Sequence, residues 1–245
     1  MKKRFYLAAV LLPILCFLAA GYICYSDQIS TELPQNTGKK VQNNSSTVWH
    51  SENVGKSITN NYLVLVNKWH RCERTSDLCC VFNNKNSSYY VKDKMVKLSN
   101  EVIPSLNKMM KECAKENLSC KVGVISGYRS ADYQSKLYDN AVNEQGQDYA
   151  DHYVARPGFS EHETGYAIDF GAMNNAGENV RFANTSASEW MLNNSYRYGF
   201  IRRYPEDKEQ YTGIALEPWH YRFVGVKAAT YMKEHNLCLE EYLKR

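Results

Sequence analysis

The stretch Phe159-Ser-Glu-His-Glu-Thr-Gly-Tyr-Ala-Ile-Asp-Phe170 carries two residues of metal-binding type, His162 and Asp169, seven positions apart. Gly165 lies between them, and a glycine permits a tight turn that would bring the two side chains together. The pattern Tyr166-Ala-Ile-Asp-Phe170 predicts a strand whose aspartate has apolar neighbours. A buried carboxylate without a partner costs several kcal/mol, so Asp169 needs a cation, a metal ion or hydrogen-bond donors.

A second motif, Glu217-Pro-Trp-His220, follows about fifty residues later. Together the two motifs supply two imidazoles, one carboxylate to bind a metal ion and one spare carboxylate. A catalytic zinc site uses three protein ligands and leaves its fourth position open, while a nearby glutamate handles protons. The pattern therefore predicts a zinc peptidase. The alternative is two core histidines beside two unrelated carboxylates, and the joint spacing of the four argues against it.

Short strands and helices are mixed along the chain without the regular alternation of a parallel α/β fold. Apolar runs bounded by turn residues predict strands at 62–67, 121–126, 166–170, 199–204 and 219–224. Helical periodicity and capping residues predict helices at 98–116, from 130 onward, and at 148–154, 186–198 and 227–235. The predicted fold class is α+β, with a small antiparallel sheet that carries the zinc site and is flanked by helices.

The N-terminal segment differs from the rest of the chain. Residues Phe5 to Cys24 are twenty consecutive positions without a formal charge, preceded by a basic cluster at 2–4. A helix of that length spans about 30 Å, the thickness of a bilayer core. Residues 1–25 therefore predict a transmembrane anchor with the following chain outside the cytoplasmic membrane. The alternative is a secretory signal cleaved near Ala19-Ala-Gly21.

The rest of the chain divides into a polar segment and a folded domain. Residues 26–60 are rich in Ser, Thr, Asn, Gln and Lys, which predicts a flexible linker, and residues 61–245 form the predicted catalytic domain. The net charge is +4, and three of the 30 Lys and Arg residues lie in the N-terminal cluster, so the remainder is close to neutral. This balance predicts no nucleic-acid partner. It makes no prediction of the oligomeric state.

Six cysteines lie outside the N-terminal segment. An exported location would permit disulfides, and an even number of cysteines fits such a framework. We expect at least one disulfide, with Cys113 and Cys120 the favoured pair because they flank a short connection. The alternative is buried free thiols. The six residues are Cys72, Cys79, Cys80, Cys113, Cys120 and Cys238.

Three motifs resemble the signatures of one enzyme family in order and in spacing. They are Ser126-Gly-Tyr-Arg-Ser130, Ser160-Glu-His-Glu-Thr-Gly-Tyr-Ala-Ile-Asp169 and Glu217-Pro-Trp-His220. From about Tyr62 to the C-terminus, the chain is similar to the VanY-type zinc D-alanyl-D-alanine carboxypeptidases. That family is related to the VanX dipeptidases and to bacterial L,D-carboxypeptidases.

The resemblance implies one zinc ion held by three ligands, which are His162, Asp169 and His220. It implies that Glu217 is the catalytic acid/base, and that Arg129 polarises the scissile carbonyl or holds the terminal carboxylate of the substrate. It further implies substrate contacts from Ser160, Gln134, Tyr204 and Trp219. From the residues alone, Arg129 is equally compatible with a surface ion pair.

The resemblance also implies the reaction. The expected substrate is the peptide stem of peptidoglycan or its lipid-linked precursor, and the expected reaction is removal of the C-terminal D-Ala from a pentapeptide. That cleavage destroys the D-Ala-D-Ala end that vancomycin-type glycopeptides bind, which implies a role in resistance, although housekeeping wall trimming has the same signature. Two alternatives remain: an L,D-carboxypeptidase acting on tetrapeptide stems, and a non-catalytic wall-binding module.

Overall fold

The computed structural model describes residues 61–116 and 118–244, and its central strand is β5 (Ala167–Asn174). β5 pairs antiparallel with β4 (Cys120–Ser126) on one side and with β8 (His220–Phe223) on the other. The register places Asp169 opposite His220 on β8. The strand predicted around Asp169 is therefore confirmed. It lies between the strand that ends at Ser126 and the strand that begins at His220, and so brings the sequence motifs side by side.

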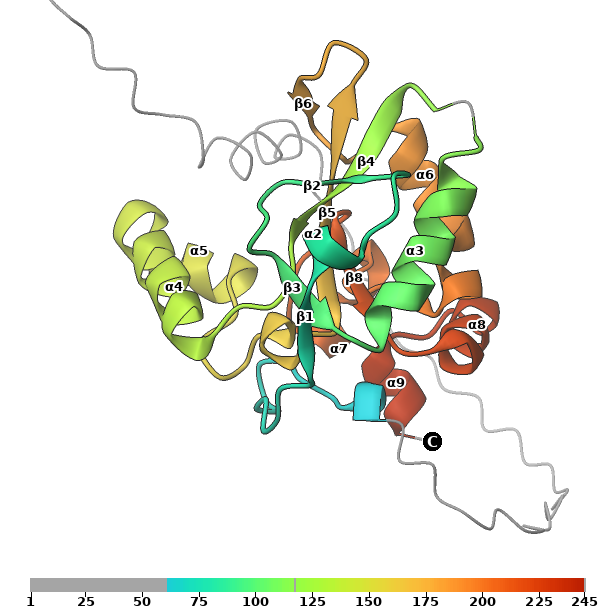
Figure 1. Cartoon of the computed structure of the whole chain (residues 1–245). Coiled ribbons are helices and arrows are strands. Elements are labelled where there is room, and N and C mark those ends of the chain that lie inside the picture. Colours follow the sequence, from blue (N-terminus) through green and yellow to red (C-terminus); the bar gives the residue numbers. More distant parts are fainter. Residues whose placement is uncertain (1–60, 117, 245) are drawn as a thin grey trace, which may run out of the picture. The chain divides into compact units, whose positions relative to one another are not determined.

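The main sheet has six strands and is mixed (Figure 1). Its order is β2 (Tyr90–Val91), β4, β5, β8 and β7 (Phe200–Arg202), and β6 (Asn179–Val180) also pairs with β5. All of its pairs are antiparallel except β2 with β4, which is parallel. A separate antiparallel pair joins β1 (Leu78–Cys80) to β3 (Lys97–Ser99). The α+β prediction is confirmed, and the antiparallel description fails only for the edge strand β2.

Helices flank the main sheet in two groups. Figure 1 shows α4 (Ala131–Gln145) and α5 (Gln147–Tyr153) together at the left of the view, away from α3 (Val102–Cys113), α6 (Ser186–Asn194) and α8 (Val226–Glu234) at the right. The predicted helices are confirmed with shifted ends. For example, Leu98 belongs to β3, so α3 begins later than expected. Its buried face carries Leu106, Met109 and Met110, as the helical spacing predicted.

The remaining helical elements are short. They are η1 (Asn61–Leu63), α2 (Val81–Asn84), η2 (Glu161–Thr164), η3 (Ser195–Tyr198), η4 (Glu206–Lys208), α7 (Glu209–Thr212) and α9 (Leu239–Leu243). Of these, η2 carries His162 and leads directly into β5. α9 was not predicted from the sequence, and its Leu239 is fully buried.

The strand predicted at 62–67 is wrong. The segment opens with the 3-10 turn η1 and continues without strand pairing to a bridge between Asn67 and His70. The reason is that a guanidinium takes the place of a neighbouring strand. Arg222 Nη2 donates to the carbonyl oxygens of Tyr62 at 2.9 Å and Val64 at 2.7 Å. The apolar residues of this segment are still partly buried, and Val66 is completely so, which is what the sequence pattern detected.

The six cysteines of the described residues are all free, so the expected disulfide between Cys113 and Cys120 is wrong in this structure. Both side chains are buried in the hydrophobic core, where they pack as small apolar groups. Burial raises the pKa of Cys113 to about 12. Since the thiolate is the reactive form, such a thiol resists oxidation. The alternative of buried free thiols holds for this pair.

Among residues 61–116 and 118–244, no helix has both the length and the apolar character that crossing a membrane requires. The predicted anchor at 1–25 and the predicted linker at 26–60 fall outside the described residues. Both stay predictions.

Gly165 ends η2 with a left-handed backbone, φ 82° and ψ 2°. A Cβ added there would lie 2.7 Å from Leu78 Cδ2 and 2.7 Å from Ser76 Oγ. Left-handed backbone costs a non-glycine residue about 1–2 kcal/mol, and overpacking adds about 1–3 kcal/mol. We expect Gly165→Ala to lower the free energy of unfolding by the sum of both effects, measured by urea denaturation.

The matched control is Gly177→Ala, because Gly177 has the same φ of 82° and open space around its Cα. It should show the backbone cost alone, about 1–2 kcal/mol. Equal losses in the two variants would mean that the close packing of η2 on Leu78 and Ser76 contributes nothing.

Candidate metal centre

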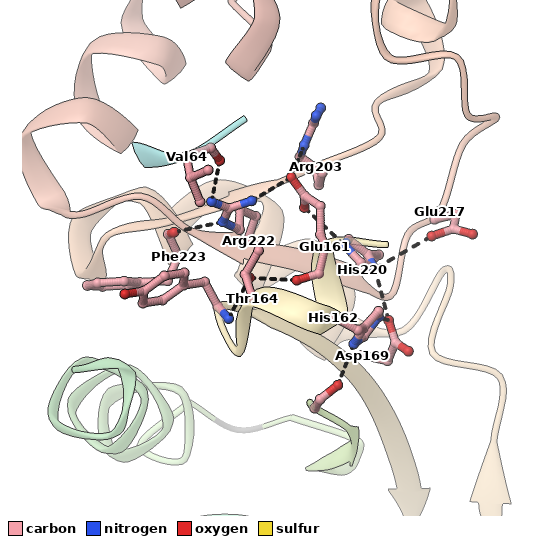
Figure 2. Close-up of polar contacts among 12 residues, drawn as sticks. Val64, Glu161, His162, Thr164, Asp169, Arg203, Glu217, His220, Arg222 and Phe223 are labelled. Carbon is pink, nitrogen blue, oxygen red and sulfur yellow. Dashed lines mark hydrogen bonds and ion pairs between the residues drawn. The ribbon is translucent and has the colours of Figure 1, made fainter. Parts of the chain in front are cut away.

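Three buried side chains converge where η2, β5 and β8 meet (Figure 2). Asp169 Oδ1 lies 3.3 Å from His162 Nε2 and 3.1 Å from His220 Nδ1. Their ligand atoms all lie within 4.8 Å of one another, so that one metal ion could contact all three. The structure thus brings together the three residues that the sequence predicted as ligands.

Local structure explains this convergence. Antiparallel pairing puts Asp169 of β5 directly across from His220 of β8. The left-handed turn at Gly165 folds η2 back, so that His162 reaches the same point from outside the sheet. The carbonyl oxygen of His162 accepts hydrogen bonds from the backbone N–H of Gly165 at 3.2 Å and of Arg129 at 3.3 Å. The turn is therefore fixed on both sides.

The backbone sets the tautomer of His162. His162 Nδ1 lies 2.6 Å from the carbonyl oxygen of Gly127, which can only accept, so Nδ1 carries the hydrogen and Nε2 presents its lone pair to the centre. Burial, followed by the nearby charge of Arg129, lowers the pKa of His162 to about 4. The imidazole is therefore neutral at physiological pH, as a metal ligand must be.

The carboxylate at the centre is ionised. Burial alone would raise the pKa of Asp169, but the adjacent His162 and Arg129 hold it well below its usual range. Burial alone would lower the pKa of His220, but its hydrogen bonds to Asp169 and Glu161 raise it to about 9, so a metal ion must displace a proton to bind this ring. Two imidazole nitrogens and one carboxylate oxygen then form the donor set that Zn²⁺ takes in catalytic sites. The donor types, their tautomers and their burial therefore fit zinc.

Glu217 lies beside the cluster without belonging to it. Its Oε2 is 3.7 Å from His220 Nδ1, and its side chain is 13% exposed, in the loop before β8. Burial raises the pKa of Glu217 to about 7, and the negative charge of Asp169 adds to the rise. A carboxyl group with that pKa can both accept and donate a proton near neutral pH.

Arg129 belongs to the centre and not to the surface. It follows β4, where a bulge between Val124 and Ser126 ends the regular pairing. Its Nη2 donates to Asp169 Oδ2, and its Nε donates to Ser126 Oγ at 3.1 Å. The Arg129 side chain is 20% exposed, so it is partly accessible to solvent. Arg129 does make an ion pair, and its partner is Asp169 of the metal cluster.

The four predicted substrate-binding residues differ in burial and in the groups that they contact. Gln134 is buried. Its Oε1 accepts a hydrogen bond from Arg129 Nη1 at 3.5 Å, and its Nε2 donates to the carbonyl oxygen of Ala155 at 2.8 Å. The ring of Tyr204 lies 4.8 Å from the ring of His220. Ser160 is buried directly before η2. Trp219 is only partly buried and packs against the hydrophobic core.

Behind His220 lies a buried set of charged residues that the sequence motifs did not predict. Glu161 and Glu240 are buried and neutralise two fully buried arginines, Arg203 and Arg222. One feature of the sequence could have indicated these residues: a charged residue, Arg222, stands among apolar neighbours in the segment that forms β8. Such a residue needs a partner, but the sequence does not say which of 26 acidic residues supplies it.

Comparisons with known proteins agree with this geometry. The family model VanY, described as D-alanyl-D-alanine carboxypeptidase, matches residues 95–226. A D-alanyl-D-alanine carboxypeptidase of Enterococcus faecium is 30% identical over 260 residues, which covers 99% of this chain and 79% of that protein.

Two solved structures share the fold. One is a mutant of the vancomycin resistance D,D-pentapeptidase VanY in complex with Zn(II), with 34% identity, a TM-score of 0.63 and coverage of 75% of this chain and 99% of that one. The other is the LD-carboxypeptidase LdcB, with 34% identity, a TM-score of 0.62 and coverage of 76% and 88%.

We expect the purified protein to bind one zinc ion and His162→Ala to lose it, because the substitution removes one of three ligands. The loss of affinity should exceed the roughly 10- to 100-fold that is typical of removing an outer-shell partner. Competition with a chromogenic chelator measures it. The control is His152→Ala: His152 is exposed on α5 and its Nδ1 contacts only the carbonyl oxygen of Asp148. Unchanged zinc affinity in His162→Ala would contradict the assignment.

Proposed function

This chain belongs to the VanY family of D-alanyl-D-alanine carboxypeptidases, and we propose that it is a zinc D,D-carboxypeptidase that removes the C-terminal D-Ala from peptidoglycan pentapeptide stems. The observation that carries the proposal is the buried cluster of His162, Asp169 and His220 with a proton-accepting carboxyl, Glu217, 3.7 Å from its edge. A non-catalytic wall-binding module would have no use for the last of these groups.

Bound zinc supplies Lewis-acid polarisation of the scissile carbonyl and a nucleophile at neutral pH. The chain's own residues supply the rest of the chemistry. Glu217 takes a proton from the attacking water and delivers it to the departing amine of D-Ala, since a pKa of about 7 suits both transfers. A positioned acid/base of this kind contributes about 100- to 10,000-fold to the rate.

Arg129 is proposed to bind the substrate. It lies against Asp169, with its guanidinium oriented by Ser126 and Gln134. Such a preorganised cation stabilises negative charge on the carbonyl oxygen, or pairs with the terminal carboxylate of the stem peptide. Either role requires a fixed orientation, which the contact of Gln134 Nε2 with the carbonyl oxygen of Ala155 supports from behind.

The proposal extends to where the enzyme acts. Residues 1–25 would anchor the chain in the cytoplasmic membrane, with the domain outside, next to peptidoglycan and its lipid-linked precursor. Support comes from the uncharged run at 5–24 alone. Membrane fractionation of cells that make the full chain tests this, and recovery of a shortened chain in the medium would favour the cleaved signal instead. Cleavage of pentapeptide there would remove the target of glycopeptide antibiotics.

The substrate is tested with synthetic stem peptides. We expect release of D-Ala from a pentapeptide that ends in D-Ala-D-Ala, and abolition of that release by a chelator, because both follow from a zinc D,D-carboxypeptidase. Liquid chromatography with mass detection measures the product. A tetrapeptide that ends in one D-Ala is the comparison substrate. Cleavage of the tetrapeptide alone would contradict the proposal and assign the enzyme to L,D-carboxypeptidases.

The role of Glu217 is tested by Glu217→Gln, which keeps the size of the side chain and removes its basicity. We expect kcat for the pentapeptide to fall by about 100- to 10,000-fold. Zinc should stay bound, since Glu217 is not among the three ligands. Steady-state kinetics and metal analysis of the same sample give both numbers. Loss of stoichiometric zinc in Glu217→Gln would mean that Glu217 is a ligand.

A further inference from the structure

Glu161 lies next to the ligand His162 in sequence, yet its side chain points away from it toward the interior (Figure 2). Its Oε1 accepts two hydrogen bonds, from Arg203 Nε at 2.7 Å and from Arg222 Nη1 at 2.7 Å. Its second oxygen, Oε2, lies 3.4 Å from His220 Nε2. One fully buried carboxylate therefore contacts two arginines and one metal ligand.

The contact with His220 is on the side of the ring away from the metal cluster. His220 Nδ1 is the nitrogen that lies 3.1 Å from Asp169 Oδ1, within the cluster. When Nδ1 gives its lone pair to a metal ion, a neutral imidazole carries its hydrogen on Nε2. That hydrogen then points at Glu161, which as a carboxylate can only accept. The two nitrogens of His220 thus face partners that require one tautomer.

The arginines hold this carboxylate in place. Arg203 also binds Glu240 through Nη1 at 2.9 Å and Nη2 at 2.6 Å, and Arg222 is fixed by the carbonyl oxygens of Tyr62 and Val64. Two buried arginines and two buried glutamates make the set electrically neutral. Glu161 is the member of the set that contacts the metal centre, so it connects α9, η1 and the residue after β7 to that centre.

We propose that Glu161 is a positioning residue for zinc: it holds the His220 ring with the hydrogen on Nε2 and the lone pair of Nδ1 directed at the metal. The inference rests on the zinc site of the proposed function and adds a residue to it. Outer-shell carboxylates that accept from a ligating histidine raise metal affinity about 10- to 100-fold in other proteins. Here the carboxylate is fixed by two guanidinium groups.

The structure indicates what Glu161→Gln would do. Both arginines donate to Oε1, so the amide oxygen of glutamine would take that position and its NH₂ group would face His220 Nε2. Two donors would then oppose each other unless His220 moves its hydrogen to Nδ1, which is the nitrogen that the metal needs. We expect the zinc dissociation constant of the full-length protein to rise about 10- to 100-fold.

The matched control is Glu240→Gln. It removes one negative charge from the same buried set and from the same partner, Arg203, but Glu240 has no contact with His220 among the described interactions. Both variants should unfold at lower temperature than wild type when zinc is removed, since each leaves the two buried arginines with one negative charge fewer to balance them. Only Glu161→Gln should bind zinc more weakly. Competition with a chelator, below both unfolding temperatures, gives the zinc affinities.

Equal loss of zinc affinity in the two variants, or no loss in Glu161→Gln, would overturn the proposal, because the set would then act only on stability. Failure of wild type to bind zinc in the same titration would instead overturn the proposed function. A second measurement needs no variant. In zinc-loaded wild type, histidine-ring NMR should show His220 with hydrogen on Nε2 and His162 with hydrogen on Nδ1. Hydrogen on Nδ1 of His220 would contradict the proposal.

Discussion

The antiparallel pairing of β5 with β8 is the constraint on which the rest of the site depends. It fixes Asp169 opposite His220, and a shift by one residue would turn each side chain to the other face of the sheet. β8 is also paired with β7 on its other side, so its register is held from both edges. The third ligand, His162, needs only a turn to join this pair, and Gly165 provides it.

A metal site of this kind places charged groups where water is excluded. Two sets of neighbouring groups offset the cost of burying them. Next to the cluster, Arg129 and the carbonyl oxygen of Gly127 satisfy Asp169 and His162. Behind His220, two arginines and two glutamates neutralise each other. Such sets add little net stability, since the cost of desolvation offsets the attraction. Their value lies in fixing orientation, which is what ligand side chains require.

The same burial gives the catalytic carboxyl its character. Among the described residues Glu217 has no ion pair with an arginine, so desolvation raises its pKa to about 7. Glu161 is more deeply buried, but two arginines bind it and hold its pKa below the usual value, so it is ionised. Two glutamates within one site thus differ in protonation because one has guanidinium partners and the other does not. The first can exchange protons, and the second can only accept hydrogen bonds.

The sequence by itself determined the chemistry of the site and most of its elements. Motif spacing identified His162, Asp169, Glu217 and His220, because a zinc site needs those side-chain types. Apolar patterns located the two strands that carry Asp169 and His220. Only the tertiary structure decided what side chains from distant segments do to one another. It replaced the strand at 62–67 by carbonyl contacts to Arg222, left Cys113 and Cys120 as buried thiols, and set Glu161 against His220. These outcomes depend on contacts between residues far apart in the chain, which local propensity and spacing do not encode.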